Sequence, residues 1–264
     1  MDLVNYHTHT YLCEHATGTI DEYIACAIDA GIKELGFSDH SPLPENFRKG
    51  YTMSAEKIEF YIDEIEKRKL KYKDKISIKL GIEIDFPLIE SFDKKYLDDN
   101  RFDYLIGSCH FIEGWSFDHP DYLEEFKKRD IDDIYSQYYE IMDSMAESGL
   151  FDIIAHFDLI KKYGHMPKND FSKKIEEIAK KIAQSETAVE INTSGLLKPV
   201  KEIYPSESII KIMFKNNVPV TLSTDSHSPE HVGFMLKETI EMLKKIGYRK
   251  ISGFTKRKRY DIII

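Results

Sequence analysis

Cysteine is scarce in this sequence, and its cysteines are widely separated. The three are Cys13, Cys26 and Cys109, and none belongs to a C-x-x-C pair. An odd number of isolated cysteines argues against a disulfide framework and favours a reducing cytoplasmic location. We expect free thiols, with Cys26 acting as a small buried apolar residue.

Long apolar runs are also missing. No segment approaches the roughly eighteen apolar residues that a membrane helix needs. Asp2 stands where a secretory signal would carry positive charge, so we expect no export and no membrane partner. The 264 residues include 42% hydrophobic and 31% charged residues. This composition is typical of a folded globular protein, and we expect one domain over residues 1–264.

The sequence has fewer basic than acidic residues. Lys and Arg number 37 against 46 Asp and Glu, which gives a formal net charge of -9. Such a surface repels polyanions, so a small substrate is favoured over nucleic acid. The one basic run, residues 256–259, is interpreted as the solvated end of a helix or strand. The sequence does not indicate an oligomeric state.

Three familiar catalytic motifs are absent from the sequence: G-x-S-x-G, the C-x-x-x-x-x-R phosphatase loop and G-x-x-x-x-G-K-[ST]. Their absence argues against catalysis by a serine or cysteine nucleophile and against a P-loop site.

Apolar runs of strand length alternate with segments of helical periodicity, the pattern of an α/β protein with a parallel sheet. We predict strands near 3–6, 34–38, 77–84, 103–108, 152–156, 187–192 and 218–223, and helices near 20–31, 54–72, 132–148, 171–184, 206–216 and 230–246. Thr19 and Glu22 form a capping-box pattern at the first helix. Two long connections, 40–53 and 111–130, are expected to cover a site.

Histidines and carboxylates are concentrated at the ends of these predicted strands. They are His7, His9, His15, Asp39, His40, Glu83, Asp85, His110, His156, Asp158, Glu190, Asp225 and His227. In a βα barrel the carboxyl ends of all strands meet at one mouth, so these side chains should converge. Imidazole and carboxylate ligands suit zinc, iron or manganese, and their number exceeds what one ion takes. The pattern therefore predicts a site for more than one metal ion.

This ligand order resembles the polymerase and histidinol phosphatase (PHP) family. The matching residues are His7-x-His9, His15, Asp39-His40, Glu83, His110, His156 and Asp225-x-His227. The segments GFSDHSPLP, FDYLIGSCHFIEGWSFD and HFDLIKKYG are similar to the histidinol-phosphatase branch of that family. The resemblance implies a distorted, TIM-like (β/α) barrel of about seven parallel strands.

The resemblance also implies three divalent metal ions (zinc, manganese or iron) and a ligand set for each. His7, His9, Glu83 and Asp225 would hold the first ion, Glu83, His110 and His156 the second, and His15, His40 and His227 the third. Glu83 would bridge two ions, since a carboxylate offers two oxygens. The implied reaction is hydrolysis of L-histidinol phosphate, in histidine biosynthesis, by a metal-bridging hydroxide.

The remaining site candidates are less firmly indicated. Asp39 and Asp158 are expected either to orient metal-bound imidazoles or to protonate the leaving group. Lys161, Lys162 and Lys198 are expected near the phosphate, where this family branch often has arginine. Trp115 and Asp118 are candidates to contact the imidazole and ammonium of the substrate, with Tyr51 lining the opposite side.

Three alternative functions stay open. Another PHP phosphoesterase would use the same metals on a nucleotide or other small phosphate ester, because loops choose the substrate. An amidohydrolase-like barrel shares the H-x-H motif, but the third ligand set (His15, His40 and His227) favours phosphoester chemistry. The third alternative is a non-enzymatic structural subunit. Such a protein would not need every metal ligand, so the uninterrupted ligand set argues against it.

Overall fold

The computed structural model describes residues 2–48 and 50–264. Its helices are α1 Ile20–Ala30, α2 Glu45–Arg48, α3 Ile58–Tyr72, α4 Ile131–Ser148, α5 Ser172–Ala183, α6 Glu207–Lys215 and α7 Leu236–Ile246. Its strands are β1 Leu3–Asn5, β2 Ile32–Phe37, β3 Ser77–Asp85, β4 Tyr104–Ser108, β5 Phe111–Ile112, β6 Trp115–Ser116, β7 Ile153–Ile154, β8 Ala188–Asn192, β9 Val220–Ser223, β10 Lys250–Thr255 and β11 Lys258–Ile263.

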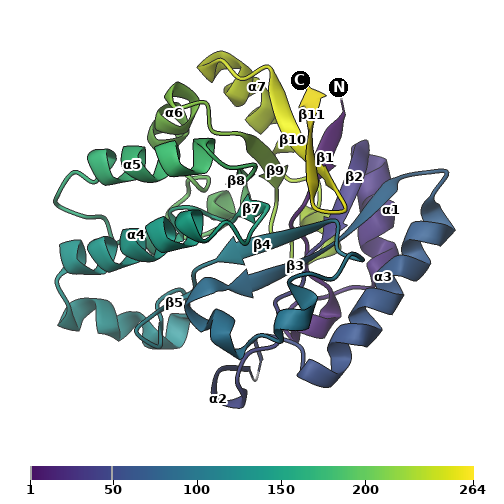
Figure 1. Ribbon diagram of the computed structural model, residues 1–264, viewed down its shortest axis with the longest axis horizontal. Coiled ribbons are helices and arrows are strands. Elements are labelled where there is room, and N and C mark those ends of the chain that lie inside the picture. Colours follow the sequence, from purple (N-terminus) through teal and green to yellow (C-terminus); the bar gives the residue numbers. More distant parts are fainter. Residues whose placement is uncertain (1, 49) are drawn as a thin grey trace.

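Seven parallel strands form the main sheet, in the order β1-β2-β3-β4-β7-β8-β9. The two edges approach each other, because the Tyr6 N–H donates to the Leu222 carbonyl at 3.1 Å and Thr8 forms a parallel bridge with Ser226. The larger helices lie around the outside (Figure 1). The predicted seven-stranded (β/α) barrel is confirmed.

Aromatic side chains fill the amino-terminal end of the barrel. The ring of Tyr6 packs edge-on against Tyr104 at 5.2 Å and against Phe254 at 5.5 Å. Gly36 and Gly81 leave the space that Tyr104 needs, since a Cβ at Gly36 would lie 2.1 Å from its Oη. Large side chains thus close this end and leave the opposite end for a site.

The hairpin of β10 and β11 was not predicted, and it covers the same end. Its turn contains Lys256 and Arg257, both at positive φ. The Arg257 guanidinium donates to the carboxylate of Asp152 and to the carbonyls of Leu97 and Leu150. The basic run is therefore a strand end, as expected, but Arg257 fastens the hairpin to the barrel instead of being simply solvated.

Most predicted elements are present, with shifted boundaries. Thr19 and Glu22 form the expected capping box, and α1 ends at Gly31 with φ of 80°. The last predicted helix begins later, at Leu236, because residues 229–231 form a separate 3-10 turn. None of the helices in the described ranges combines the length and apolar character that crossing a bilayer requires.

Candidate metal centre

The nine predicted metal ligands converge at the carboxyl end of the barrel. They follow or lie near the end of six strands, which are β1 (His7, His9, His15), β2 (His40), β3 (Glu83), β4 (His110), β7 (His156) and, at the far edge of the sheet, β9 (Asp225, His227). Imidazole rings consequently lie close together, as for His9 and His227, whose stacked centroids are 4.1 Å apart. Side chains far apart in the sequence form one cluster.

Glu83 lies at the middle of this cluster and is 1% exposed. Its Oε2 is 2.7 Å from Nδ1 of His40 and 3.3 Å from Nε2 of His7. Its Oε1 is 3.0 Å from Nε2 of His156. Burial favours the neutral acid, but His40 and His7 outweigh it and hold the pKa of Glu83 well below its ordinary value. An ionised carboxylate thus presents one oxygen to each side of the cluster.

Possible ligand atoms lie within 4.8 Å of one another in several groups. Three of the groups match the predicted sets, apart from Glu83 in the first: His7 with His9 and Asp225, Glu83 with His110 and His156, and His15 with His40 and His227. Two further groups cross those sets: His9 with His40 and Glu83, and His9 with Cys13 and His227. The Oε2 of Glu83 lies 3.7 Å from Nε2 of His9, so the first group also has this carboxylate within reach.

Several atoms of the cluster are buried without a hydrogen bond. They are Nε2 of His7, both ring nitrogens of His9 and Nε2 of His227. Native structures rarely leave buried polar atoms unsatisfied. Nitrogen and carboxylate donors are those that zinc, manganese and iron accept. The residues therefore fit divalent metal ions.

The imidazoles of His15 and His227 are kept neutral by their surroundings. Burial, together with neighbouring imidazoles, lowers the pKa of His15 to about 4 and that of His227 to about 3. Both rings remain neutral at physiological pH, which is the form that binds a cation.

Glu190 and Asp85 orient ligating rings, a role that the sequence did not assign to them. Oε1 of Glu190 is 2.6 Å from Nδ1 of His7, and its Oε2 accepts from the His156 backbone N–H at 2.7 Å. Oδ2 of Asp85 is 3.0 Å from Nδ1 of His110. Such partners leave the other ring nitrogen free for a metal. The available signal was Glu83-x-Asp85, because residues two apart share a strand face.

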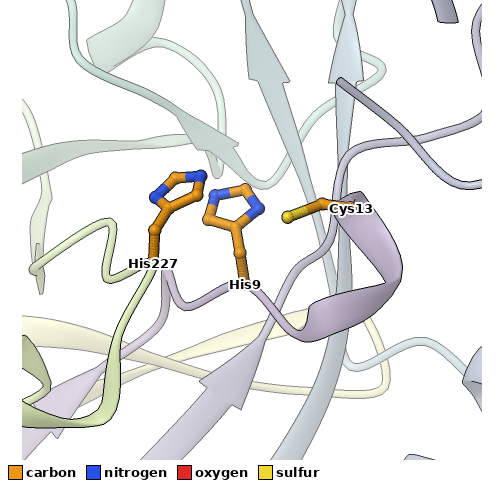
Figure 2. Close-up of side chains that lie close together, drawn as sticks. All are labelled: His9, Cys13 and His227. Atoms are coloured by element: carbon orange, nitrogen blue, oxygen red, sulfur yellow. The ribbon is translucent and has the colours of Figure 1, made fainter. Parts of the chain in front are cut away.

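Cys13 lies beside His9, on the side away from His227 (Figure 2). Burial raises the pKa of its thiol well above the ordinary value, so the sulfur stays protonated. All three cysteines are free, and Cys26 is only partly buried. Cys13 thus occupies space next to the cluster as a neutral group.

Asp39 and Asp158 support the site from outside the cavity. Both oxygens of Asp39 accept hydrogen bonds from Thr10, and burial raises its pKa to about 7. Asp158 pairs with Lys161 at 2.9 Å and accepts from the Ser206 N–H, beside a separate cavity of about 190 Å³. Neither carboxylate lines the cavity over the histidines, so a structural role is favoured over leaving-group protonation.

A cavity of about 380 Å³ opens above the histidines, and both predicted long loops line it. Nζ of Lys162 binds Oδ2 of Asp118 at 3.0 Å, and Lys198 lies at the same cavity. Burial would raise the pKa of Asp118, but Lys162 and His110 hold it well below its usual range. Tyr51 and His119 line another part of the wall, with ring centroids 5.0 Å apart.

Lys161 and Trp115 do not line this cavity, which corrects two predicted substrate contacts. Lys161 is buried, and its ammonium is used by Asp158, Glu202 and the Ile203 carbonyl. Trp115 is 6% exposed and packs edge-on against Phe126 at 4.7 Å. Both side chains make their contacts with other residues of the protein and not with the cavity.

Comparisons with known proteins identify the family of this chain. The family model for the PHP domain matches residues 5–194. A probable histidinol-phosphatase of Deinococcus radiodurans is 36% identical, over 95% of this chain and 96% of the relative. The histidinol-phosphatase of Bacillus subtilis is 27% identical, over 89% of this chain and 97% of the relative.

A solved structure shares the fold. It is the histidinol phosphate phosphatase of Lactococcus lactis subsp. lactis complexed with zinc, L-histidinol and phosphate, with a TM-score of 0.84 and 23% identity over 98% of this chain and 99% of that one. From the matched family model and the full-length likeness to the Deinococcus radiodurans protein, this chain belongs to the PHP domain family.

Proposed function

We propose that this protein is a metal-dependent phosphatase that hydrolyses L-histidinol phosphate to L-histidinol and phosphate. The observation that carries the proposal is the group of nine imidazole and carboxylate ligands beneath a cavity with two lysines and a carboxylate on its wall. The full-length relatives named histidinol-phosphatase, and the solved relative with zinc, L-histidinol and phosphate, support the choice of substrate.

We propose three divalent ions, zinc, manganese or iron, held by the three sets of ligands. Glu83 would serve two of them, because its Oε2 lies near His7 of the first set and its Oε1 near His156 of the second. When bound, the ions neutralise phosphoryl charge and supply an acidified water as the nucleophile. Glu190 and Asp85 hold the rings of His7 and His110 in the orientation that coordination requires.

Lys162 and Lys198 are proposed to bind the phosphate. Both side chains line the cavity, and burial together with the nearby Lys162 lowers the pKa of Lys198. A dianionic ester relieves their repulsion. Arginine can bind a phosphate through two parallel hydrogen bonds, whereas the lysine ammonium acts as a point charge. Orientation of the phosphate therefore depends on further hydrogen-bond donors.

The organic half of the substrate is assigned to the loop walls. Asp118 is ionised and lies at the cavity, where it suits an ammonium or imidazolium. Tyr51 and His119 offer aromatic faces in the same region, which suit the imidazole of histidinol.

We also propose that the whole chain forms one domain. The matched region ends at residue 194. Asp225 and His227 lie beyond it, yet their ligand atoms complete two of the sets. The three free cysteines are compatible with the cytoplasmic location expected from the sequence.

In the test, purified protein is loaded with manganese or zinc and is assayed separately with histidinol phosphate, with nucleoside monophosphates and with p-nitrophenyl phosphate. We expect the highest kcat/KM with histidinol phosphate. Equal or faster phosphate release from the other esters would contradict this substrate, and a preference for a nucleotide would favour the alternative PHP phosphoesterase.

A further inference from the structure

Tyr204 is a residue of the cavity to which neither the ligand sets nor the lysines assign a role. It lines the cavity together with Asp225 and Lys198, and its side chain is fully buried. Its Oη has no hydrogen-bond partner among the described residues. Buried tyrosine hydroxyls normally find a partner, and this one borders the cavity, where a bound ligand would supply an acceptor.

The position of Tyr204 is held by the barrel itself. Its backbone N–H donates to the Asn192 carbonyl at 2.9 Å, and the Asn192 N–H donates back at 2.7 Å. Asn192 ends β8, and its amide donates to Glu190 at 3.1 Å, so Tyr204 is attached to the strand that orients His7. The phenol is therefore positioned relative to the metal centre before any ligand binds.

Packing around the ring fixes its orientation as well. A Cβ at Gly195 would lie 2.9 Å from Cε2 of Tyr204, so the ring occupies space that only glycine leaves open. On another side, Nζ of Lys161 lies 5.5 Å from the ring centroid. A hydroxyl on so constrained a ring is a preorganised donor.

Burial raises the pKa of the Tyr204 phenol, and the carboxylates of Asp158 and Asp225 raise it further. The hydroxyl therefore keeps its proton at neutral and alkaline pH and acts as a neutral donor. Oxygen atoms of a phosphoryl group are strong acceptors, and the cavity already carries the lysines that attract this anion.

We propose that Oη of Tyr204 donates a hydrogen bond to a phosphoryl oxygen of the bound phosphate ester. This inference rests on the proposed function, because it supposes a phosphoryl group above the metal centre. In this arrangement the ammonium of Lys198 neutralises the charge of the phosphate, and the hydrogen bond from the phenol of Tyr204 orients it. This assigns to Tyr204 the orienting contact that lysines alone do not give.

Tyr204→Phe removes only the hydroxyl and is the principal test. Inorganic phosphate is titrated calorimetrically into the manganese-loaded wild type and variant, and kcat/KM for histidinol phosphate is measured from pH 6 to 9. We expect phosphate affinity and kcat/KM to fall by about tenfold or more. The ratio of variant to wild type should not change with pH, and metal content should be unchanged.

Tyr23→Phe is the matched control. Tyr23 is also fully buried with an unpartnered Oη, but it does not line the cavity. We expect this variant to keep wild-type phosphate affinity. A second variant, Tyr204→Leu, should lose at least as much affinity as Tyr204→Phe, and thermal unfolding checks that all three proteins fold.

The outcomes separate the two proposals. Unchanged phosphate affinity in Tyr204→Phe, an equal loss in Tyr23→Phe, or no phosphate binding by the wild type would overturn the role of Tyr204. If the wild type binds phosphate but does not prefer histidinol phosphate, the proposed function fails, while the calorimetric comparison still decides for or against Tyr204.

Discussion

Nδ1 of His7 lies 2.6 Å from Oε1 of Glu190, and both side chains are fully buried. This contact occupies one ring nitrogen and leaves Nε2, which has no hydrogen bond, on the side of Glu83 and Asp225. Burial opposes a charged imidazole, yet Glu190 and Glu83 hold the pKa of His7 well above its ordinary value. Glu190 therefore raises the basicity of the His7 ring and fixes the direction of its Nε2.

Glu190→Gln should weaken metal binding without removing a ligand. The amide keeps the shape of the side chain but loses the charge that orients His7, so we expect zinc affinity to fall roughly 10- to 100-fold. Competition against a chromogenic chelator measures this affinity. Glu186→Gln is the control, because the Glu186 side chain is 86% exposed and lies outside the site. Equal affinity in Glu190→Gln and wild type would show that the contact does not tune the metal centre.

Glu83→Ala should lower the metal content more than loss of a terminal ligand. Oε2 of Glu83 lies 3.3 Å from Nε2 of His7 and Oε1 lies 3.0 Å from Nε2 of His156, so its removal affects the first two ligand sets. We expect about one ion per chain where the wild type holds about three, since a carboxylate can serve two cations. Elemental analysis of dialysed protein measures the content. The bridging assignment is wrong if Glu83→Ala keeps the wild-type complement.

Lys198→Ala should raise KM for the phosphate ester. Lys198 lies at the cavity near Lys162, and removing its charge leaves the phosphate with one fewer cation, so we expect KM to rise about tenfold or more. Lys198→Arg, which keeps the charge, should recover most of the loss. Lys211→Ala, on the exposed face of α6, provides the control. A wild-type KM in Lys198→Ala would exclude Lys198 from phosphate binding.

The ion pair of Asp118 with Lys162 should make stability depend on pH in a defined direction. The pKa of Asp118 is held below its usual range, so the folded protein binds fewer protons here than the unfolded chain does. The pair then stabilises the fold above about pH 4, the ordinary aspartate pKa, and this contribution is lost as the pH falls through the folded value.

Asp118→Asn should accordingly be less stable than wild type at pH 7, by about 1–3 kcal/mol. The difference should be constant from pH 5 to 7 and should shrink below pH 4. Urea unfolding of both chelator-treated proteins across this range measures it. A difference that grows on acidification would have the opposite sign and contradict the assigned pKa direction.

Much of the barrel was predictable because its signals are local. Apolar runs of strand length alternate with amphipathic segments, and the capping box of Thr19 and Glu22 marks the start of α1. The hairpin of β10 and β11 was missed because the contacts that hold it are long-range, such as the hydrogen bond that the Phe254 N–H donates to Oη of Tyr6 at 3.0 Å. Nothing in residues 250–263 alone indicates that partner.

The convergence of histidines and carboxylates at the strand ends was predictable for the same reason, whereas the cavity wall was not. His7 and His9 are two residues apart, and an extended backbone directs such side chains to one face wherever the strand lies. Lys161 and Lys162 are neighbours in one 3-10 turn, yet Lys161 turns to Asp158 and Lys162 to Asp118. Their positions in the sequence do not show which of the two lysines faces the cavity.

By itself, the sequence determined which residues end the strands and therefore which side chains gather at the mouth, because the order of strands and the alternation of side chains are properties of the chain. Only the tertiary structure decided that Glu190 orients His7, that Trp115 packs inside and that Tyr204 reaches the cavity. Those outcomes depend on contacts between segments that are distant in the sequence. Burial and charge at each place decide which of several similar side chains makes a given contact, and the sequence alone does not distinguish them.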